Sequence, residues 1–473
     1  MSRNTNYFNS KGFKLMLRDY EEAEKAGVPI ILSSEDFNDI AEYYYDNGDV
    51  KHALKVIDNT IKLYPGVIGP LLFRARIELL DNNDIDKAKY YIEQIEDKTD
   101  LDYYYIVAEI MMNQGKFDEA DYYLEECYAP LEGDEKAYFE IDVATIFTEY
   151  NDIQKGTKWF KRCSNKDLIE YKELEAKITM ASGDFQKSQT LFENLVEKDP
   201  FSSDYWSSLA SSQFFNNNIE DSISSSEYSI AIDPSNTIAL LNKANGLYGL
   251  GNYSEALKYY ERCNSISKRD FNVEMLIASC YLSMEMFDKA EERFRKAECL
   301  VEPDDYRLVD MYKEWSYCLG RLGRVKEGIA LLERTRDMDC DYDEILLYGG
   351  MLLMGCGYYD EGKDLLLQAL CYTKNSPRTM HKISLTFYEL GDMNLTYNLM
   401  TLLFKHYKDW HEGYGCLASC CYEMQKYDEC LKYIKRAVKY SPEEAKQMLE
   451  RLFPEGTDPK DYYKIMKNML KNK

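Results

Sequence analysis

The stretch LGNYSEALKYY, residues 250–260, recurs along the chain with small changes. QGKFDEADYYL stands at 114–124, CGYYDEGKDLL at 356–366 and MQKYDECLKYI at 424–434. In each copy a bulky apolar residue lies two positions after the glycine or its replacement. These anchor residues are Val50, Ile85, Phe117, Ile153, Phe185, Ile219, Tyr253, Phe287, Val325, Tyr359, Met393 and Tyr427. Their commonest spacing is 34 residues, and such a period predicts a stack of about twelve structural repeats.

Each repeat is predicted to fold as two helices joined by a tight turn. A small residue stands nine positions before most anchors, as at Ala210 and Ala244, and another stands three positions after, as at Ala256 and Gly362. Small residues on facing helices let the two backbones approach closely. The glycine before the anchor suits the left-handed backbone conformation that ends many helices.

The pattern resembles the tetratricopeptide repeat. Repeat six carries Trp206, Leu209, Ala210, Ile219 and Pro234, and repeat seven carries Ala244, Gly251, Tyr253, Ala256 and Tyr260. The resemblance extends to long bacterial tetratricopeptide proteins with no assigned chemistry. It implies an all-α fold, an α-α superhelix in which about twelve helix-turn-helix repeats form a solenoid.

The resemblance covers residues 34–442, and the flanking segments are predicted to cap the array. Residues 1–33 contain an amphipathic helix, 11–27, with Phe13, Leu15, Met16, Leu17 and Tyr20 available to cover repeat one. Residues 443–473 are predicted to cover repeat twelve, because a stack must hide its last apolar face. Repeat two departs from the pattern, with a slipped first helix around LLFRARIELL.

The composition limits the classes of partner. A net charge of −25 opposes binding to nucleic acid or to an anionic membrane, since both depend on neutralisation by Lys and Arg. Thirteen scattered cysteines indicate reduced thiols and a cytoplasmic location. The N-terminal residues have no apolar segment typical of secretion. The longest uncharged apolar run, residues 345–359, is shorter than a bilayer span. The oligomeric state stays open.

No catalytic or metal-binding constellation stands out. His411, Cys416 and Cys420 lack the spacing of a zinc site, and the cysteines match a packed first helix. Asp337, Asp339, Asp341 and Asp343 alternate like a calcium loop, but Tyr342 and Tyr348 occupy positions that need Gly and Glu. No phosphate-binding or nucleophile motif is present. The sequence therefore predicts no enzyme, no cofactor and no metal.

By resemblance, the first helix of each repeat lines a concave groove that binds a peptide or a partner protein. Repeats six to eight place an almost uncharged group there, and repeat nine adds a basic spot. The predicted partner-binding residues are Ser207, Ser211, Phe214, Asn242, Asn245, Tyr248, Met275, Ser279, Lys313, Tyr317 and Arg321. His381 and Lys382 follow in repeat eleven. The combination of cations and Asn needed for a chaperone carboxylate clamp is missing, because Asn272 and Leu276 stand where cations are required.

These observations favour a non-catalytic protein interaction scaffold or adaptor. The alternative is a regulatory peptide receptor whose superhelix changes shape on ligand binding. An RNA-binding helical repeat is disfavoured by the charge, and an enzyme is the least favoured class. The serine-rich repeat six is compatible with a bendable segment, a modification target or sequence drift.

Overall fold

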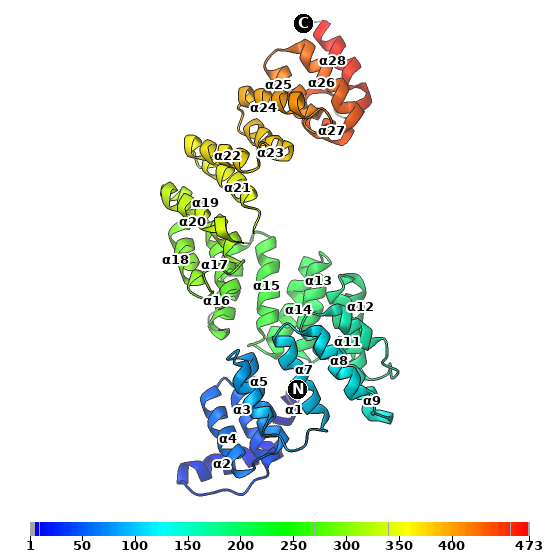
Figure 1. Ribbon diagram of the computed structural model, residues 1–473, viewed down its shortest axis with the longest axis vertical. Coiled ribbons are helices and arrows are strands. Elements are labelled where there is room, and N and C mark those ends of the chain that lie inside the picture. Colours follow the sequence, from blue (N-terminus) through cyan, green and yellow to red (C-terminus); the bar gives the residue numbers. More distant parts are fainter. Residues whose placement is uncertain (1–4, 9, 268–269, 339, 455, 472–473) are drawn as a thin grey trace. The chain divides into compact units, whose positions relative to one another are not determined.

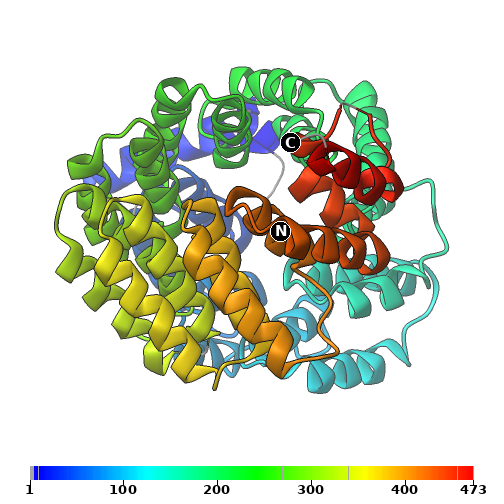
Figure 2. The same ribbon diagram turned by 90° about the horizontal axis from the view of Figure 1, so that it is seen from above.

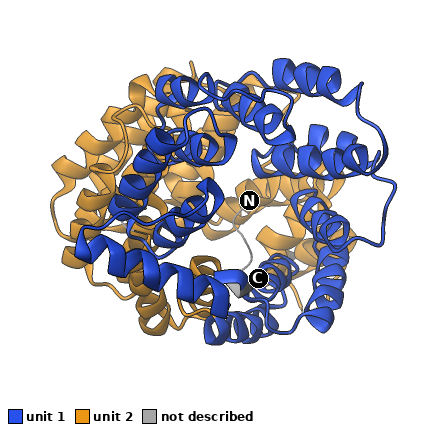
Figure 3. Cartoon of the chain, turned by 90° about the horizontal axis from the view of Figure 1, so that it is seen from below, with its two compact units in different colours: residues 1–232 blue, residues 233–473 orange. Residues whose placement is uncertain are grey.

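The computed structural model describes residues 5–8, 10–267, 270–338, 340–454 and 456–471. Within these residues the regular secondary structure is helical throughout. The chain divides into two compact units, residues 1–232 and 233–473 (Figure 3). Each unit is a succession of helix pairs (Figure 1).

Unit 1 holds repeats one to six behind two N-terminal helices. The leading helices are α1 (Thr5–Phe8) and α2 (Lys11–Ala26). The pairs are α3 (Ser34–Asp46) with α4 (Val50–Leu63), α5 (Ile68–Leu80) with α6 (Ile85–Ile92), α7 (Leu101–Asn113) with α8 (Phe117–Tyr128), α9 (Gly133–Glu149) with α10 (Ile153–Phe160), α11 (Ile169–Ala181) with α12 (Phe185–Lys198), and α13 (Ser203–Phe215) with α14 (Ile219–Ile232).

Unit 2 holds repeats seven to twelve and the C-terminal helices. The pairs are α15 (Thr237–Gly249) with α16 (Tyr253–Ile266), α17 (Phe271–Ser283) with α18 (Phe287–Glu298), α19 (Leu308–Arg321) with α20 (Val325–Arg334), α21 (Tyr342–Gly355) with α22 (Tyr359–Tyr372), α23 (Pro377–Glu389) with α24 (Met393–His406), and α25 (Tyr414–Glu423) with α26 (Tyr427–Tyr440). The chain then forms α27 (Pro442–Leu449) and α28 (Tyr462–Lys471). Figures 1 and 2 both show α21 and α22 side by side.

The anchor residues mark where helices begin. Every one of the twelve anchors is the first residue of the second helix of its pair, from Val50 in α4 to Tyr427 in α26. Two positions before each anchor the backbone has a positive φ angle, whether the residue is a glycine, as at Gly251, or another type, as at Glu285. Repeat two carries an extra residue in its turn: the small residue Ala75 lies ten positions before Ile85 and is fully buried. The predicted helix-turn-helix repeat is confirmed.

The small residues lie where the paired helices approach each other. Ala210, Ala244 and Ala256 are fully buried. In repeat ten both helices carry glycine at these positions, and a Cβ atom on Gly362 would lie 2.6 Å from the carbonyl oxygen of Gly350. The paired helices therefore approach each other closely at the positions where both carry small side chains.

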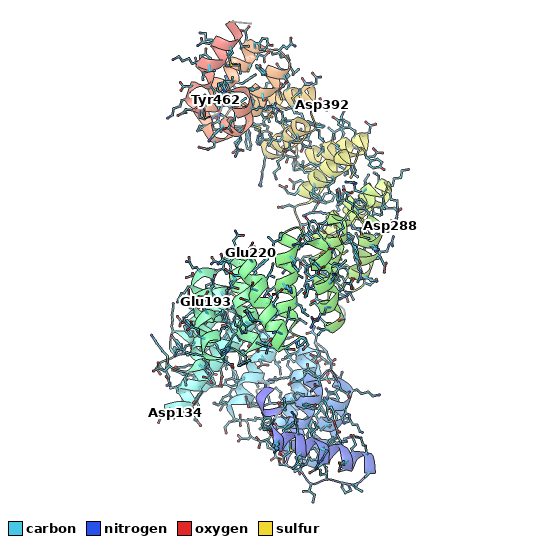
Figure 4. All side chains as sticks on the ribbon, turned by 180° about the vertical axis from the view of Figure 1, so that it is seen from behind. Asp134, Glu193, Glu220, Asp288, Asp392 and Tyr462 are labelled. Atoms are coloured by element: carbon cyan, nitrogen blue, oxygen red, sulfur yellow. The ribbon has the colours of Figure 1, made fainter. Side chains whose placement is uncertain are left out.

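Helices at both ends cover the last apolar faces of the array. Phe13, Leu17 and Tyr20 of α2 are buried, whereas Leu15 is 51% exposed, so Leu15 does not take part in the predicted cap. The reason is helical periodicity: Phe13 and Leu17 are four residues apart and share one face, while Leu15 falls between them. At the other end α27 and α28 pack on α26, and the ring of Tyr462, labelled in Figure 4, stacks on Phe453 with centroids 4.0 Å apart. The predicted bounds of the array, 34 and 442, stay a prediction.

Candidate functional site

The first helices of unit 2, namely α15, α17, α19, α21, α23 and α25, form a row that we call the first-helix row. Hydrogen bonds join successive members. The hydroxyls of Tyr248 and Ser283 lie 2.9 Å apart, and Ser279 donates to Glu314 at 2.9 Å. Lys382 of α23 forms an ion pair with Glu344 of α21. These bonds hold the side chains that take part in them in fixed positions along the row.

Three of the predicted partner-binding residues lie in unit 1, on α13. Ser207 and Ser211 are buried, and their hydroxyls donate to main-chain oxygens of Asp204 and Ser207 at 3.0 and 3.1 Å. Phe214 is half-buried and contacts Phe215 edge to face. The other predicted residues belong to unit 2.

The predicted residues on α15 make contacts inside the protein. Asn245 accepts a hydrogen bond from Tyr260 at 2.6 Å, which leaves its amide group able to donate elsewhere. Asn242 is only 8% exposed. Tyr248 is half-buried, and its ring contacts Tyr253. Asn245 and Tyr248 therefore present partly occupied polar groups beside an aromatic surface.

On α17, the predicted residue Ser279 contacts a carboxyl group of α19, Glu314, that the sequence did not single out. Met275 and Ser279 are half-buried, and the Ser279 hydroxyl donates to Glu314. Burial raises the pKa of Glu314, the hydrogen bond from Ser279 opposes that rise, and nearby Asp310 adds to it. The pKa of Tyr348 on α21 is raised by burial and then by Glu314.

The basic spot predicted in repeat nine is engaged within the chain. Lys313 forms an ion pair with Asp310 at 2.7 Å. The Arg321 guanidinium donates to the Tyr317 hydroxyl at 3.2 Å and lies over the ring of Phe287. In repeat eleven, burial lowers the pKa of His381, which favours the neutral imidazole. A partner would therefore compete with contacts that these groups already make.

Glu314 and Tyr348 were missed by the sequence analysis, although a signal existed. Both lie eleven positions before an anchor, the position that Asn242 holds in repeat seven. Reading that position through every repeat would have found them.

The residues that the sequence suggested as possible metal ligands are either buried inside a helix or spread along the chain. Cys416 and Cys420 are fully buried in α25, and the pKa of Cys416 is raised by its hydrogen bond with Cys420 and by burial. Asp343 lies in the first turn of α21, while Asp339 lies outside the described residues. In the part of the chain that the structure describes, no group of three or more His, Cys, Asp or Glu is arranged to hold a metal ion. The same residues contain no helix long and apolar enough to cross a membrane.

Comparison with known proteins gives matches to helical repeat proteins. A sequence model of the tetratricopeptide repeat matches residues 238–270 and 411–451, which correspond to repeats seven and twelve. The TPR repeat-containing protein YpiA of Bacillus subtilis is 20% identical over 86% of this chain and 79% of its own length. The BBSome complex member BBS4 of Bos taurus is 19% identical over 48% of this chain and 42% of its own length.

Solved structures that match the chain include YrrB, described as a TPR protein with an unusual peptide-binding site. It covers 40% of this chain and 96% of its own, with 15% identity and a TM-score of 0.33. The structure of the Cut9–Hcn1 hetero-tetramer covers 94% of this chain and 97% of the compared chain, with 13% identity and a TM-score of 0.37.

The likeness to tetratricopeptide repeat proteins rests on the repeat itself. Twelve helix pairs begin their second helix at one register, turn through a positive φ angle and bury small residues at the helix contact. The sequence model recognises two of these pairs. In this repeat the chain is similar to tetratricopeptide repeat proteins.

Proposed function

We propose that the protein is a non-catalytic interaction scaffold and that the first-helix row of unit 2 binds a peptide or a partner protein. The observation that carries the proposal is the set of half-buried, uncharged side chains along this row, in a chain of which 30% is charged. Asn245, Tyr248, Met275, Ser279 and Tyr317 belong to it. Aromatic, Met and amide side chains of this kind are suited to adaptable contact with a partner.

The electrostatics favour a partner that is neutral or mildly basic where it docks. Lys313 and Lys382 already have carboxylate partners, so they attract an acidic segment less. Glu314 instead holds an acidic group among the uncharged residues, and the chain as a whole carries −25. Nucleic acid would meet long-range repulsion.

A cytoplasmic location belongs to the same proposal. Cys163, Cys280 and Cys318 are buried, and burial raises the pKa of each thiol to about 12. Such thiols behave as core side chains. A chain that buries most of its cysteines in this way suits a reducing compartment.

Affinity capture from native cytosol tests the proposal. The double variant Tyr248→Ala with Met275→Asp changes the middle of the row. The control is Leu367→Asp, which places the same charge at an exposed position of α22. We expect the double variant to lose at least one partner that both the wild type and the control retain. Retention of every partner by the double variant would contradict binding at this row.

The alternative, a regulatory peptide receptor, predicts an additional result. A captured peptide would change the radius of gyration of the full chain in small-angle scattering. A scaffold that binds without a change of shape would leave that radius unaltered.

A further inference from the structure

Unit 2 contains a pocket of about 640 Å³ next to the second helices of repeats seven and eight. It is lined by Asn264, Glu274, Glu292, Arg295, Lys296, Cys299 and Leu300. These residues come from α16, α17, α18 and the turn that follows α18. Asp288, labelled in Figure 4, is the second residue of α18. The volume falls in the range of pockets that hold small ligands.

Repeat four shows what occupies the corresponding place elsewhere in the chain. Glu140 lies thirteen positions before the anchor of repeat four, and Tyr128 lies eleven positions after the anchor of repeat three. The Tyr128 hydroxyl donates to Glu140 at 2.5 Å. Arg162, nine positions after the anchor of repeat four, lies 5.3 Å from the centre of the Tyr128 ring. A phenol, a carboxylate and a cation thus meet where repeats three and four adjoin, and we call such a place the junction of the later repeat.

Repeat nine assembles the same three groups with two of them exchanged. Tyr312 takes the register of Glu140, and Glu298 takes the register of Tyr128. The Tyr312 hydroxyl donates to Glu298 at 2.9 Å. Arg334, at the register of Arg162, lies 4.7 Å from the centre of the Tyr312 ring and pairs with Glu298 at 2.6 Å. Two junctions in different units therefore combine a phenol with a carboxylate and a cation, although the ring comes from α8 in one and from α19 in the other.

The junction of repeat eight keeps the carboxylate and the cation but has no ring. Glu274 stands at the register of Glu140, and Lys296 stands at the register of Arg162. Asn264 replaces the tyrosine and donates to Glu274 at 2.9 Å. The pocket lies among these three residues. An amide is much smaller than a phenol, so the exchange leaves the space that the ring of Tyr128 fills in repeat four.

We propose that this pocket binds the phenol side chain of a tyrosine supplied by a partner peptide. The ring replaces the one missing from the junction, beside the cationic side chains of Lys296 and Arg295. The phenolic hydroxyl donates to the pocket acceptors, as Tyr128 donates to Glu140. This site is lined mainly by the second helices α16 and α18, and Glu274 is its one lining residue from the first-helix row. It does not depend on the function proposed for that row.

The polar groups at the pocket suit a neutral hydrogen-bond donor. Glu274 is 7% exposed, and Arg293 donates to it at 3.1 Å, so much of its charge is already balanced. The side-chain oxygen of Asn264 is buried and has no hydrogen-bond partner among the described residues. Lys296 pairs with Glu292 at 2.7 Å, and Arg295 pairs with Glu291 at 2.7 Å. A phenol adds a donor without adding a charge.

Binding to the full-length protein tests the proposal, with N-acetyl-tyrosinamide, N-acetyl-phenylalaninamide and p-cresol as probes. We expect the tyrosine probe to bind at least roughly tenfold more tightly than the phenylalanine probe, because only tyrosine can donate to the buried acceptors. Tighter binding of N-acetyl-tyrosinamide than of p-cresol supports a peptide source for the ring. Equal binding of the tyrosine and phenylalanine probes, or preference for p-cresol, overturns the proposal.

Asn264→Tyr restores the missing ring from within the chain. We expect it to abolish binding of the tyrosine probe while the protein stays folded, since the junction of repeat four holds Tyr128 at this register beside Glu140. Asn194→Tyr, at an exposed position of α12, is the control and should bind as the wild type does. Undiminished binding by Asn264→Tyr would overturn the assignment of the pocket.

Thiol labelling gives a readout that needs no variant. Cys299 lines the pocket and is exposed, and Cys371 is exposed on α22 away from it. We expect a saturating concentration of the tyrosine probe to slow alkylation of Cys299 severalfold and to leave the alkylation rate of Cys371 unchanged. The folded protein is labelled, and mass spectrometry of its peptides then measures the label at each cysteine. Equal rates at Cys299 with and without the probe would overturn the proposal even if Asn264→Tyr failed to fold.

Discussion

Repeat six (α13 and α14) and repeat ten (α21 and α22) place different side chains at the same buried positions. Six and seven residues after the anchor, repeat six has Ser225 and Ser226, whereas repeat ten has Leu365 and Leu366, and all four are buried. Three residues after the anchor, Ser222 corresponds to Gly362. The comparison teaches that the repeat register fixes which positions are buried but leaves the chemistry of the buried side chains open.

The two cores are stabilised by different interactions. In repeat six the hydroxyls are satisfied by main-chain oxygens: Ser222 donates to Ala210 at 2.7 Å, and Ser226 donates to Ser222 at 2.7 Å. In repeat ten the leucines remove apolar surface from water, each worth about 1.5–3 kcal/mol. A hydrogen bond exchanged with water contributes about 1 kcal/mol. Repeat six should therefore be the less stable of the two.

The largest expected effect comes from placing a serine in the leucine core. Leu366→Ser deletes a side chain that is 1% exposed, and we expect unit 2 to lose about 2–5 kcal/mol of unfolding free energy, as for buried leucine truncations. Urea unfolding combined with hydrogen exchange of peptides from α21 and α22 measures it. A loss below about 1 kcal/mol would mean that repeat ten accepts a polar core as repeat six does.

A second, smaller effect distinguishes the helix contacts of the two repeats. Gly362→Ala brings a Cβ atom to 2.6 Å from the carbonyl oxygen of Gly350, so α21 and α22 must separate, at a cost of about 1–3 kcal/mol. Ser222→Ala is the matched control, because this position already accommodates a side chain and Ala is common there in other repeats. We expect the control to lose no more than about 1 kcal/mol in thermal unfolding, the contribution of the Ser222 hydrogen bond to Ala210.

The sequence predicted the register well because the requirement behind it is local and steric. A turn with positive φ and a close helix contact each act within one repeat, so the anchors located all twelve second helices. Contacts between repeats were harder to predict. The pairing of Lys382 with Glu344 and of Ser279 with Glu314 depends on rotamers and on neighbours that a repeating pattern does not specify. The boundary between the two units, after Ile232, could not be predicted either, because the repeat period continues across it unchanged.

A third prediction concerns the contact of repeat six with the repeat before it. The hydroxyls of Ser188 and Ser212 lie 2.9 Å apart, and Ser188 also donates to the carbonyl oxygen of Ala176 at 3.2 Å. Ser188→Ala removes this bridge, but Ser212 can still donate to Ser208. We expect a loss of about 0.5–1.5 kcal/mol, with faster hydrogen exchange in α12 and α13. Unchanged exchange there would show that the bridge is dispensable.

The smallest effect is expected for Ser226→Ala. The Ser226 hydroxyl donates to the carbonyl oxygen four residues earlier on its own helix, an oxygen that also accepts the helical main-chain N–H. Its removal therefore leaves no buried group without a partner, and Ala is the better helix former. We expect the unfolding free energy of unit 1 to change by no more than about 0.5 kcal/mol. If the variant instead lost as much as Leu366→Ser, the serines of repeat six would form a cooperative network, and the two cores would be equally demanding in their chemistry.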